Sequence, residues 1–236
     1  MVAIGFSVQA QQSIKRPKLM VGIVVDQMRW DYLYRYYDRY DENGGFKRML
    51  NQGFACENTL IPYTPTYTGC GHSSIYTGSV PAINGITGNF WWDSEQMRSV
   101  YCTEDKSVNT VGSNSTAGKQ SPRNLLTTTI CDELKIATNF KSKIVGISLK
   151  DRGGILPAGH SANAAYWYDN SVGNWITSTY YMNELPKWAA DFNNQKIVDQ
   201  YYEKGWSLLY PENSYLQSTG DEKAYESKPF GATFPY

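Results

Sequence analysis

Short apolar runs alternate with helical patterns along the first two thirds of the chain, and this alternation is what most limits the possible fold. The run Leu19–Asp26 is almost continuously apolar, which is typical of a strand buried on both faces of a parallel sheet. Further strands are predicted at Phe54–Ile61 and Ile144–Leu149. The order strand, helix, strand, helix, strand predicts an α/β domain with a mostly parallel sheet.

The helices of this pattern are predicted from apolar spacing and from helix breakers. Two helical stretches follow Asp26, and the second of them ends at Gly53. A short helix is expected over Gly71–Tyr76. A longer amphipathic helix is expected to begin after Ser121-Pro122, with apolar positions at Leu126, Ile130, Leu134 and Ala137.

The composition changes near Asn163, where short aromatic and β-branched runs replace the helical pattern. Residues 164–169 and 175–181 are separated by a turn, and this predicts a hairpin. A helix near Glu184–Asn193 and a Tyr-rich tail follow. We therefore expect residues 11–162 to form the main α/β part, and residues 163–236 to form a truncated, aromatic-rich insertion or cap.

Charge and hydropathy exclude several classes of protein. The 236 residues carry 22 Lys and Arg against 22 Asp and Glu, so no basic excess favours nucleic acid as a partner. No apolar run reaches the roughly 20 residues that span a bilayer, so no transmembrane segment is expected. Residues 1–10 resemble the end of a signal peptide, which predicts export to the periplasm or outside the cell. The alternative is an ordinary frayed terminus.

Polar residues follow the predicted strands, where ligands of open parallel sheets bind. Asp26 suits a divalent metal, or it caps the next helix. Thr68 stands before a short helix, as a metal-activated nucleophile or simply as the helix cap. Lys150 and Arg152 are two residues apart on a segment predicted to be extended, so both side chains point to one face and Asp151 points away. They are either a clamp for a phosphoryl group or a solvated turn.

Three sequence blocks, in order, resemble one known family. They are VGIVVDQMRWDYLYRYY, PTYTGCGHSSIYTGSVPAINGITGN and SLKDRGGILPAGH. The chain is similar from about Arg16 onward to the phosphate-irrepressible, PafA-like alkaline phosphatases, relatives of the type I phosphodiesterases and nucleotide pyrophosphatases. The resemblance implies an alkaline-phosphatase-like three-layer α/β sandwich, incomplete here because only the N-terminal portion is present.

The resemblance also implies a role for each motif residue. Asp26 corresponds to a metal ligand, and Thr68 to a nucleophile that also binds zinc. Asn89 corresponds to the residue whose amide donates to a phosphoryl oxygen, and Lys150 and Arg152 to the pair that binds the remaining oxygens of a monoester. The implied reaction is hydrolysis of small phosphate monoesters with two Zn²⁺ ions, through a phosphothreonine at Thr68. A diester has lost one anionic oxygen, so the Lys-Arg pair favours a monoesterase.

The chain departs from this family in its metal ligands, because the further Asp and His ligands of the family come from a C-terminal part. Of its two histidines, His72 is expected to pack or hydrogen-bond, and His160 to order a loop near the site or touch substrate. We therefore expect the chain to be an N-terminal fragment that is inactive by itself. A monomer is the favoured oligomeric state. A phosphodiesterase or sulfatase-like hydrolase and a non-catalytic envelope binding module remain as alternatives.

The four cysteines add one open question. Cys56, Cys70, Cys102 and Cys131 have no CxxC spacing, so a zinc knuckle is not supported. One disulfide is possible in an oxidising compartment, and the spacing leaves its pairing open.

Overall fold

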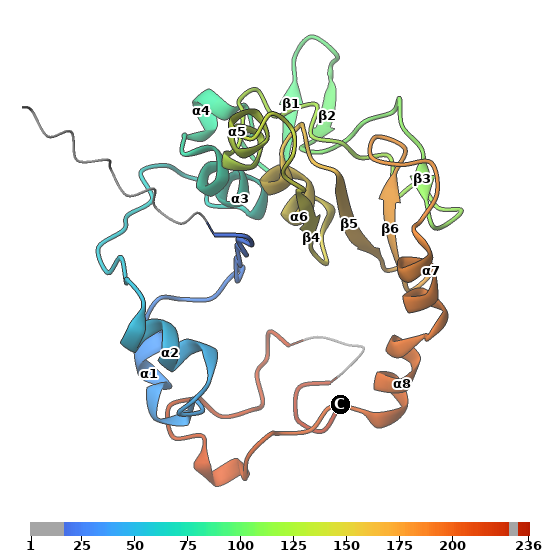
Figure 1. The fold of residues 1–236 in the computed structure, drawn as a ribbon. Helices are drawn as coiled ribbons and strands as arrows, with labels where there is room; N and C mark the ends of the chain where they lie inside the picture. Colours follow the sequence, from blue (N-terminus) through green and yellow to red (C-terminus); the bar gives the residue numbers. More distant parts are fainter. Residues whose placement is uncertain (1–16, 227–230) are drawn as a thin grey trace, which may run out of the picture.

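The computed structural model describes residues 17–226 and 231–236, and Figure 1 shows their arrangement. Its α-helices are α1 (Tyr32–Arg35), α2 (Gly45–Gln52), α3 (Thr68–Thr77), α4 (Pro81–Asn84), α5 (Ile130–Ala137), α6 (Asp151–Ala158), α7 (Lys187–Asn194) and α8 (Ile197–Lys204). Short 3₁₀ turns are η1 (Tyr37–Arg39) and η2 (Glu212–Ser214). The strands are β1 (Phe90–Asp93), β2 (Arg98–Tyr101), β3 (Thr110–Val111), β4 (Val145–Ile147), β5 (Ala164–Asp169) and β6 (Asn174–Ser178). Helices pack against a sheet, which confirms the predicted α/β class, although the elements do not follow the predicted order.

The strands form a two-stranded hairpin, β1-β2, and a four-stranded sheet in the order β3-β6-β5-β4. Only β4 and β5 run parallel; the β5-β6 and β6-β3 pairs are antiparallel. The sheet of the described residues is therefore mixed, where the sequence predicted a mostly parallel one. The reason is local, because the short turn between β5 and β6 can join only antiparallel strands.

Helix α6 lies at the centre of the packed part. It lies against β4 and β5, and α3 and α5 lie beside it (Figure 1). Its residue Ile155 packs with Ala165, Trp167 and Ile176 of the sheet. Its neighbour Leu156 packs in a second cluster with Ile86, Cys102 and Leu125. One helix thus joins the sheet to the loops around the β1-β2 hairpin.

The close approach of α6 to the sheet depends on Gly146 in β4. A Cβ built at this position would clash with the backbone oxygen of Gly154 in α6. Any side chain here would therefore push the helix away from the strand. Because Lys150 follows β4 and precedes α6, this contact also sets where Lys150 stands.

Helix α5 begins later than the sequence predicted. Its first residue is Ile130, and Thr129 caps it: the Thr129 hydroxyl accepts from the Asp132 N–H, and the Asp132 carboxylate accepts from the Thr129 N–H. This reciprocal pair ends the preceding loop at Thr129, so Ser121-Pro122 does not start the helix. The apolar spacing predicted the helix correctly, and the cap decided its first residue.

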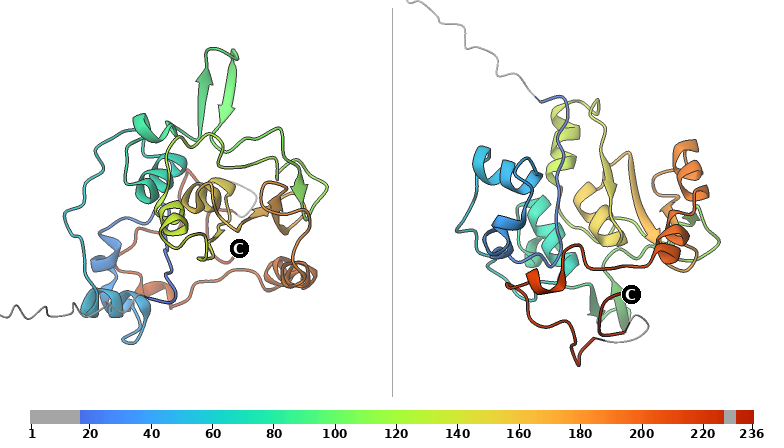
Figure 2. Two further views of the ribbon diagram at one scale, coloured as in Figure 1. Left: turned by 45° about the horizontal axis from the view of Figure 1, so that its top comes forward. Right: turned by 90° about the horizontal axis from the view of Figure 1, so that it is seen from below.

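Two predicted strands are not formed in the structure. Leu19–Asp26 and Phe54–Ile61 have no strand partner among the described residues, and their apolar side chains are exposed, with 77% for Ile23 and 93% for Phe54. An apolar run becomes a strand only when a neighbour satisfies its backbone groups, and none of the described strands pairs with these runs. The segments near α1, α2 and the end of the chain lie apart from the sheet (Figures 1 and 2).

The predicted hairpin at 164–181 is confirmed as β5 and β6. The boundary expected at 162/163 falls between β4 and β5, which pair with each other, so the hairpin shares a sheet with β4. The division into a main part and a cap stays a prediction. The proposed signal peptide at residues 1–10 lies outside the described residues, within which no helix is long and apolar enough to span a bilayer.

Candidate active site

Thr68 is the first residue of α3, and its hydroxyl is held by a carboxylate from a distant part of the chain. Tyr67 has an extended backbone, and the helix begins directly after it. The Thr68 hydroxyl donates to Asp26 Oδ2 over 2.9 Å. The free N–H groups and positive dipole end of a helix N-terminus favour an anion at this position.

Asp26 joins the N-terminal segment to two helix starts. Besides the contact with Thr68, its Oδ2 lies 3.9 Å from Lys150 Nζ, just before α6. Both side chains of this ion pair are partly exposed, so its own contribution to stability is small. Its position is more important, because the Thr68 hydroxyl and the Lys150 ammonium group both approach the same oxygen of the Asp26 carboxylate.

Asn89 completes the N-terminal turn of α3. Its side-chain Oδ1 accepts the Gly69 N–H over 2.9 Å, and its backbone oxygen accepts the Cys102 N–H over 3.0 Å. With Oδ1 occupied, the Nδ2 group is left as the free donor of this amide within the described chain. Gly69 is needed for this contact, because a Cβ there would come within 3.2 Å of Asn89 Oδ1.

The start of α6 differs from its prediction. Lys150 precedes the helix, and Asp151 and Arg152 are its first two residues, so the argument from an extended segment is wrong. Instead of diverging, Asp151 and Arg152 share a partner. Tyr101 donates its hydroxyl to Asp151 Oδ1 over 2.5 Å and accepts from Arg152 Nη1 over 2.7 Å. Arg152 is mostly buried, with 17% of its side chain exposed.

Burial dominates the ionisation of this group. It raises the pKa of the Asp151 carboxyl above its ordinary value, although the bonds from Tyr101 and the Arg152 N–H act in the opposite direction. Burial also raises the pKa of the Tyr101 hydroxyl, with the nearby Asp151 charge adding to it. The pKa of the buried Cys102 thiol rises to about 12 for the same reason, so this thiol is not a reactive thiolate near neutral pH.

The two histidines hold the surrounding backbone. His72 is 7% exposed, and its Nδ1 donates to the Thr68 carbonyl oxygen over 2.9 Å, which confirms a packing and hydrogen-bonding role. His160 contributes its backbone: its N–H donates to Asp132 Oδ2, and its carbonyl oxygen accepts from Tyr180. These bonds order its loop, whereas contact with substrate stays a prediction.

The described residues offer a metal ion only part of a coordination shell. Asp26 and Thr68 present two hard oxygen donors 2.9 Å apart. Within residues 17–226 and 231–236, no group of three or more His, Cys, Asp or Glu side chains comes together to hold an ion. Asp26 and Thr68 fit two positions of a site that needs about four ligands.

Sequence reasoning missed three residues of this site: Gly69, Tyr101 and Asp151. Gly69 could have been found from the sequence, because a glycine directly after Thr68 at a helix start indicates a close approach to the backbone. For Asp151 the sequence predicts the wrong direction, because Asp151 belongs to α6 and not to an extended segment. Tyr101 lies in no motif, and only the folded hairpin brings it to α6. The four cysteines, all within the described chain, are unpaired.

Comparison with known proteins identifies the family of this chain. The family described as type I phosphodiesterase / nucleotide pyrophosphatase matches residues 20–228. The chain is 62% identical over 98% of its length to a protein of Myroides odoratus named calcium-transporting ATPase. It is 61% identical over 95% of its length to alkaline phosphatase PhoV of Synechococcus elongatus. It is also 55% identical over 97% of its length to alkaline phosphatase PafA of Elizabethkingia meningoseptica.

The match to solved structures extends to the fold. The crystal structure of wild-type alkaline phosphatase PafA superposes with a TM-score of 0.91 at 55% identity over 95% of this chain. A PafA variant with substitutions at one threonine, one asparagine, one lysine and one arginine gives the same score. The chain spans 41 to 42% of the three relatives' length and 44% of the PafA chain, in agreement with an incomplete α/β sandwich. The chain belongs to the type I phosphodiesterase/nucleotide pyrophosphatase family, in the alkaline phosphatase superfamily.

Proposed function

We propose that this chain supplies the N-terminal part of a zinc-dependent phosphate monoester hydrolase, an alkaline phosphatase. The observation that carries this proposal is the meeting of Thr68 and Lys150 at Asp26 Oδ2, at the N-terminus of α3. A hydroxyl nucleophile, a cation and free helix N–H groups at one point suit the transfer of a phosphoryl group.

Each residue has a separate task in the proposed reaction. Thr68 Oγ1 loses its proton and attacks phosphorus, the bond from phosphorus to the leaving oxygen breaks, and that oxygen takes up a proton and leaves as an alcohol. A phosphothreonine forms. Water then cleaves the phosphothreonine, which releases inorganic phosphate and restores the Thr68 hydroxyl. Asn89 Nδ2, Lys150 and Arg152 bind the non-bridging oxygens, where charge spreads in the loose transition state.

Asp26 and Thr68 are the proposed zinc ligands from this chain. A bound zinc ion supplies the positive charge that lowers the pKa of an alcohol ligand and makes it nucleophilic. We expect the other ligands, and those of a second ion, to come from residues outside the described ranges. These 236 residues alone are then expected to be inactive.

The comparisons support the proposed residues. Two of the relatives reported above carry the name alkaline phosphatase. The PafA variant has substitutions at a threonine, an asparagine, a lysine and an arginine, in that order along its chain. Thr68, Asn89, Lys150 and Arg152 follow the same order of residue types here.

Phosphodiester hydrolysis is the second candidate, since the matching family is described as a phosphodiesterase and nucleotide pyrophosphatase family. Lys150 and Arg152 separate the two functions. A monoester carries two negative charges, whereas a diester carries one charge and a second bulky group. Removal of either cation should therefore harm a monoesterase much more than a diesterase.

The test compares hydrolysis of p-nitrophenyl phosphate and bis-p-nitrophenyl phosphate with added zinc. It uses the 236 residues alone and the full gene product, meaning these residues with whatever coding sequence follows Tyr236. We expect the full gene product to prefer the monoester, and Lys150→Ala to reduce that preference. Lys143→Ala, at an exposed lysine before β4, is the matched control. A preference for the diester supports the second candidate, and no hydrolysis of either ester favours a binding module.

Export is part of the proposal, on the basis of the apolar run and small residues at positions 2–10. We expect the mature protein in the periplasm or outside the cell. N-terminal sequencing of the protein from fractionated cells tests this, and a retained Met1 contradicts it.

A further inference from the structure

Arg152 is anchored to the β1-β2 hairpin by one hydroxyl group. Tyr101 accepts a hydrogen bond from Arg152 Nη1 over 2.7 Å and donates one to Asp151 Oδ1 over 2.5 Å. The direct distance between Arg152 Nη1 and Asp151 Oδ1 is longer, 3.8 Å. The hydroxyl therefore stands between the guanidinium and the carboxylate, and it ties both to the hairpin.

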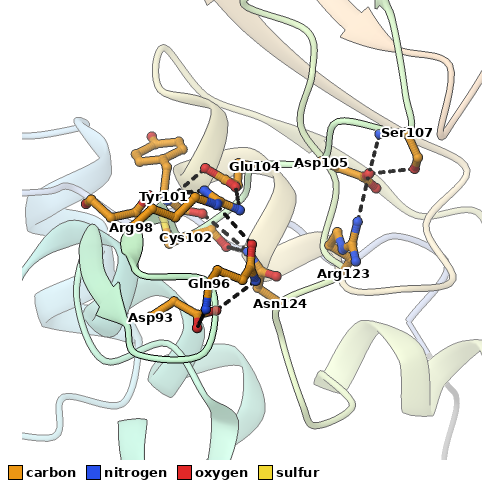
Figure 3. Close-up of polar contacts among 11 residues, drawn as sticks. Asp93, Gln96, Arg98, Tyr101, Cys102, Glu104, Asp105, Ser107, Arg123 and Asn124 are labelled. Carbon is orange, nitrogen blue, oxygen red and sulfur yellow. Dashed lines mark hydrogen bonds and ion pairs between the residues drawn. The ribbon is translucent and has the colours of Figure 1, made fainter.

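Tyr101 itself is held on several sides. Its N–H donates to Glu104 Oε2 over 3.2 Å, and its carbonyl oxygen accepts from Asn124 Nδ2 over 3.3 Å (Figure 3). Its ring packs on Phe90 with 4.8 Å between centroids, and the Arg152 guanidinium carbon lies 5.8 Å from the ring centre. Such a fixed tyrosine can hold a flexible arginine in one orientation.

The hairpin connects this anchor to Asn89. Asn89 directly precedes β1, and its carbonyl oxygen accepts from the N–H of Cys102, the residue after Tyr101. Phe90 and Tyr101 are directly paired across the two strands. The hairpin thus presents Asn89 to α3 just before its first strand, and Tyr101 to α6 at the end of its second strand.

Arg152 keeps one donor group that no described residue uses. Its Nε atom is buried and has no hydrogen-bond partner among the described residues. An unpaired buried donor is unfavourable, so this guanidinium retains hydrogen-bonding capacity that a phosphoryl group could use. Because burial raises the pKa of Tyr101, its hydroxyl stays protonated and keeps donating to Asp151 at alkaline pH.

We propose that Tyr101 is a positioning residue, which holds the Arg152 guanidinium in the orientation that binds the non-bridging oxygens of a phosphate monoester. This inference rests on the proposed function and assigns a residue outside the three motif blocks. It makes substrate preference depend on the hairpin, because loss of the hydroxyl frees Arg152 to turn towards Asp151.

The test is a comparison of Tyr101→Phe, Arg152→Ala and the double variant in the full gene product. We expect Tyr101→Phe to lower kcat/KM for p-nitrophenyl phosphate roughly 10- to 100-fold, and to change that for bis-p-nitrophenyl phosphate by less than about 3-fold. Inorganic phosphate should inhibit Tyr101→Phe more weakly by a similar factor. In the Arg152→Ala background, loss of the hydroxyl should have almost no further effect, because the two residues act as one unit.

Tyr40→Phe is the matched control, since it removes a tyrosine bond of 2.7 Å that ends on the Tyr32 carbonyl oxygen, away from the hairpin. It should leave both kcat/KM values unchanged. Equal losses for both esters in Tyr101→Phe, or losses that multiply with Arg152→Ala, overturn the positioning role while the monoesterase proposal stands. If Arg152→Ala itself leaves monoester hydrolysis and phosphate inhibition intact, the substrate-binding role of Arg152 and this inference fail together. The monoesterase proposal itself fails only if the unaltered full gene product does not prefer the monoester.

Discussion

Thr68 Oγ1 lies 2.9 Å from Asp26 Oδ2, although 42 positions separate the two residues in the chain. Thr68 starts a regular helix, whereas Asp26 ends an extended segment that pairs with no strand of the described chain. The contact is therefore tertiary. It places a hydroxyl group, hydrogen-bonded to a carboxylate, at the positive end of a helix dipole.

We predict that Thr68→Ala abolishes hydrolysis of both test esters by the full gene product. The hydroxyl is the proposed nucleophile, so its loss should lower kcat/KM roughly 10³-fold or more. Steady-state kinetics measure this effect. Thr77→Ala, at the other end of α3, should retain nearly full activity. Retention of most activity by Thr68→Ala would remove Thr68 from the mechanism.

Gly69→Ala should damage the site more than it damages the fold. A Cβ at position 69 would come within 3.2 Å of Asn89 Oδ1 and the Gly88 carbonyl oxygen, so Asn89 must move. We expect about a 10-fold loss of kcat/KM for the monoester.

The control for this change is Gly71→Ala in the same helix, where a new Cβ would meet no atom within 4 Å. It should leave activity unchanged and raise the free energy of unfolding by about 0.5–1 kcal/mol. Equal activity losses in the two variants would show that the helix, not Asn89, is sensitive.

The free energy of unfolding should depend on the buried side chains of α6. Leu156 is fully buried between the hairpin and the surrounding loops, so Leu156→Ala should lower the free energy of unfolding by about 2–5 kcal/mol. Urea unfolding followed by circular dichroism measures the change. Leu216→Ala, at a leucine that is 86% exposed, should change it by less than about 0.5 kcal/mol. A similar effect of both substitutions would contradict the assigned core.

Asp132 should make the protein sensitive to acid. Burial alone would raise the pKa of this carboxyl, but hydrogen bonds from the N–H groups of Thr129, Ser161 and His160 outweigh it and lower the pKa. A lowered folded-state pKa stabilises the fold above the unfolded value of about 3.9. This contribution is lost as the pH falls through the lower folded-state value.

Asp132→Asn tests this linkage. The variant should be less stable than the original protein near pH 7, by about 1–3 kcal/mol, and the difference should shrink below about pH 4. Unfolding measured at a series of pH values gives both quantities, and the exposed neighbour Glu133→Gln serves as control. A stability difference that stays constant down to pH 2 would rule out this role of the Asp132 charge.

Local features of the fold were predictable from the sequence because they depend on neighbouring residues. The helix after Thr68, the hairpin of β5 and β6, and the apolar face of α5 all follow from spacing and turn residues within a few positions. The candidate residues Asp26, Thr68 and Lys150 were also proposed from local reasoning, as polar residues that follow predicted strands. Of these strands only β4, before Lys150, is formed among the described residues.

Tertiary structure decided which groups meet and which apolar runs are buried. The run at residues 19–25 has the composition of a buried strand, yet it is exposed, because burial requires a partner that the run itself cannot supply. Tyr101 is the converse case, a residue of the site that local sequence could not predict. It lies in no motif, and it reaches Arg152 only because β2 folds against the start of α6. The local sequence determines the residue types and predicts the helix starts. Contacts between side chains that are distant in the sequence form only when the chain folds.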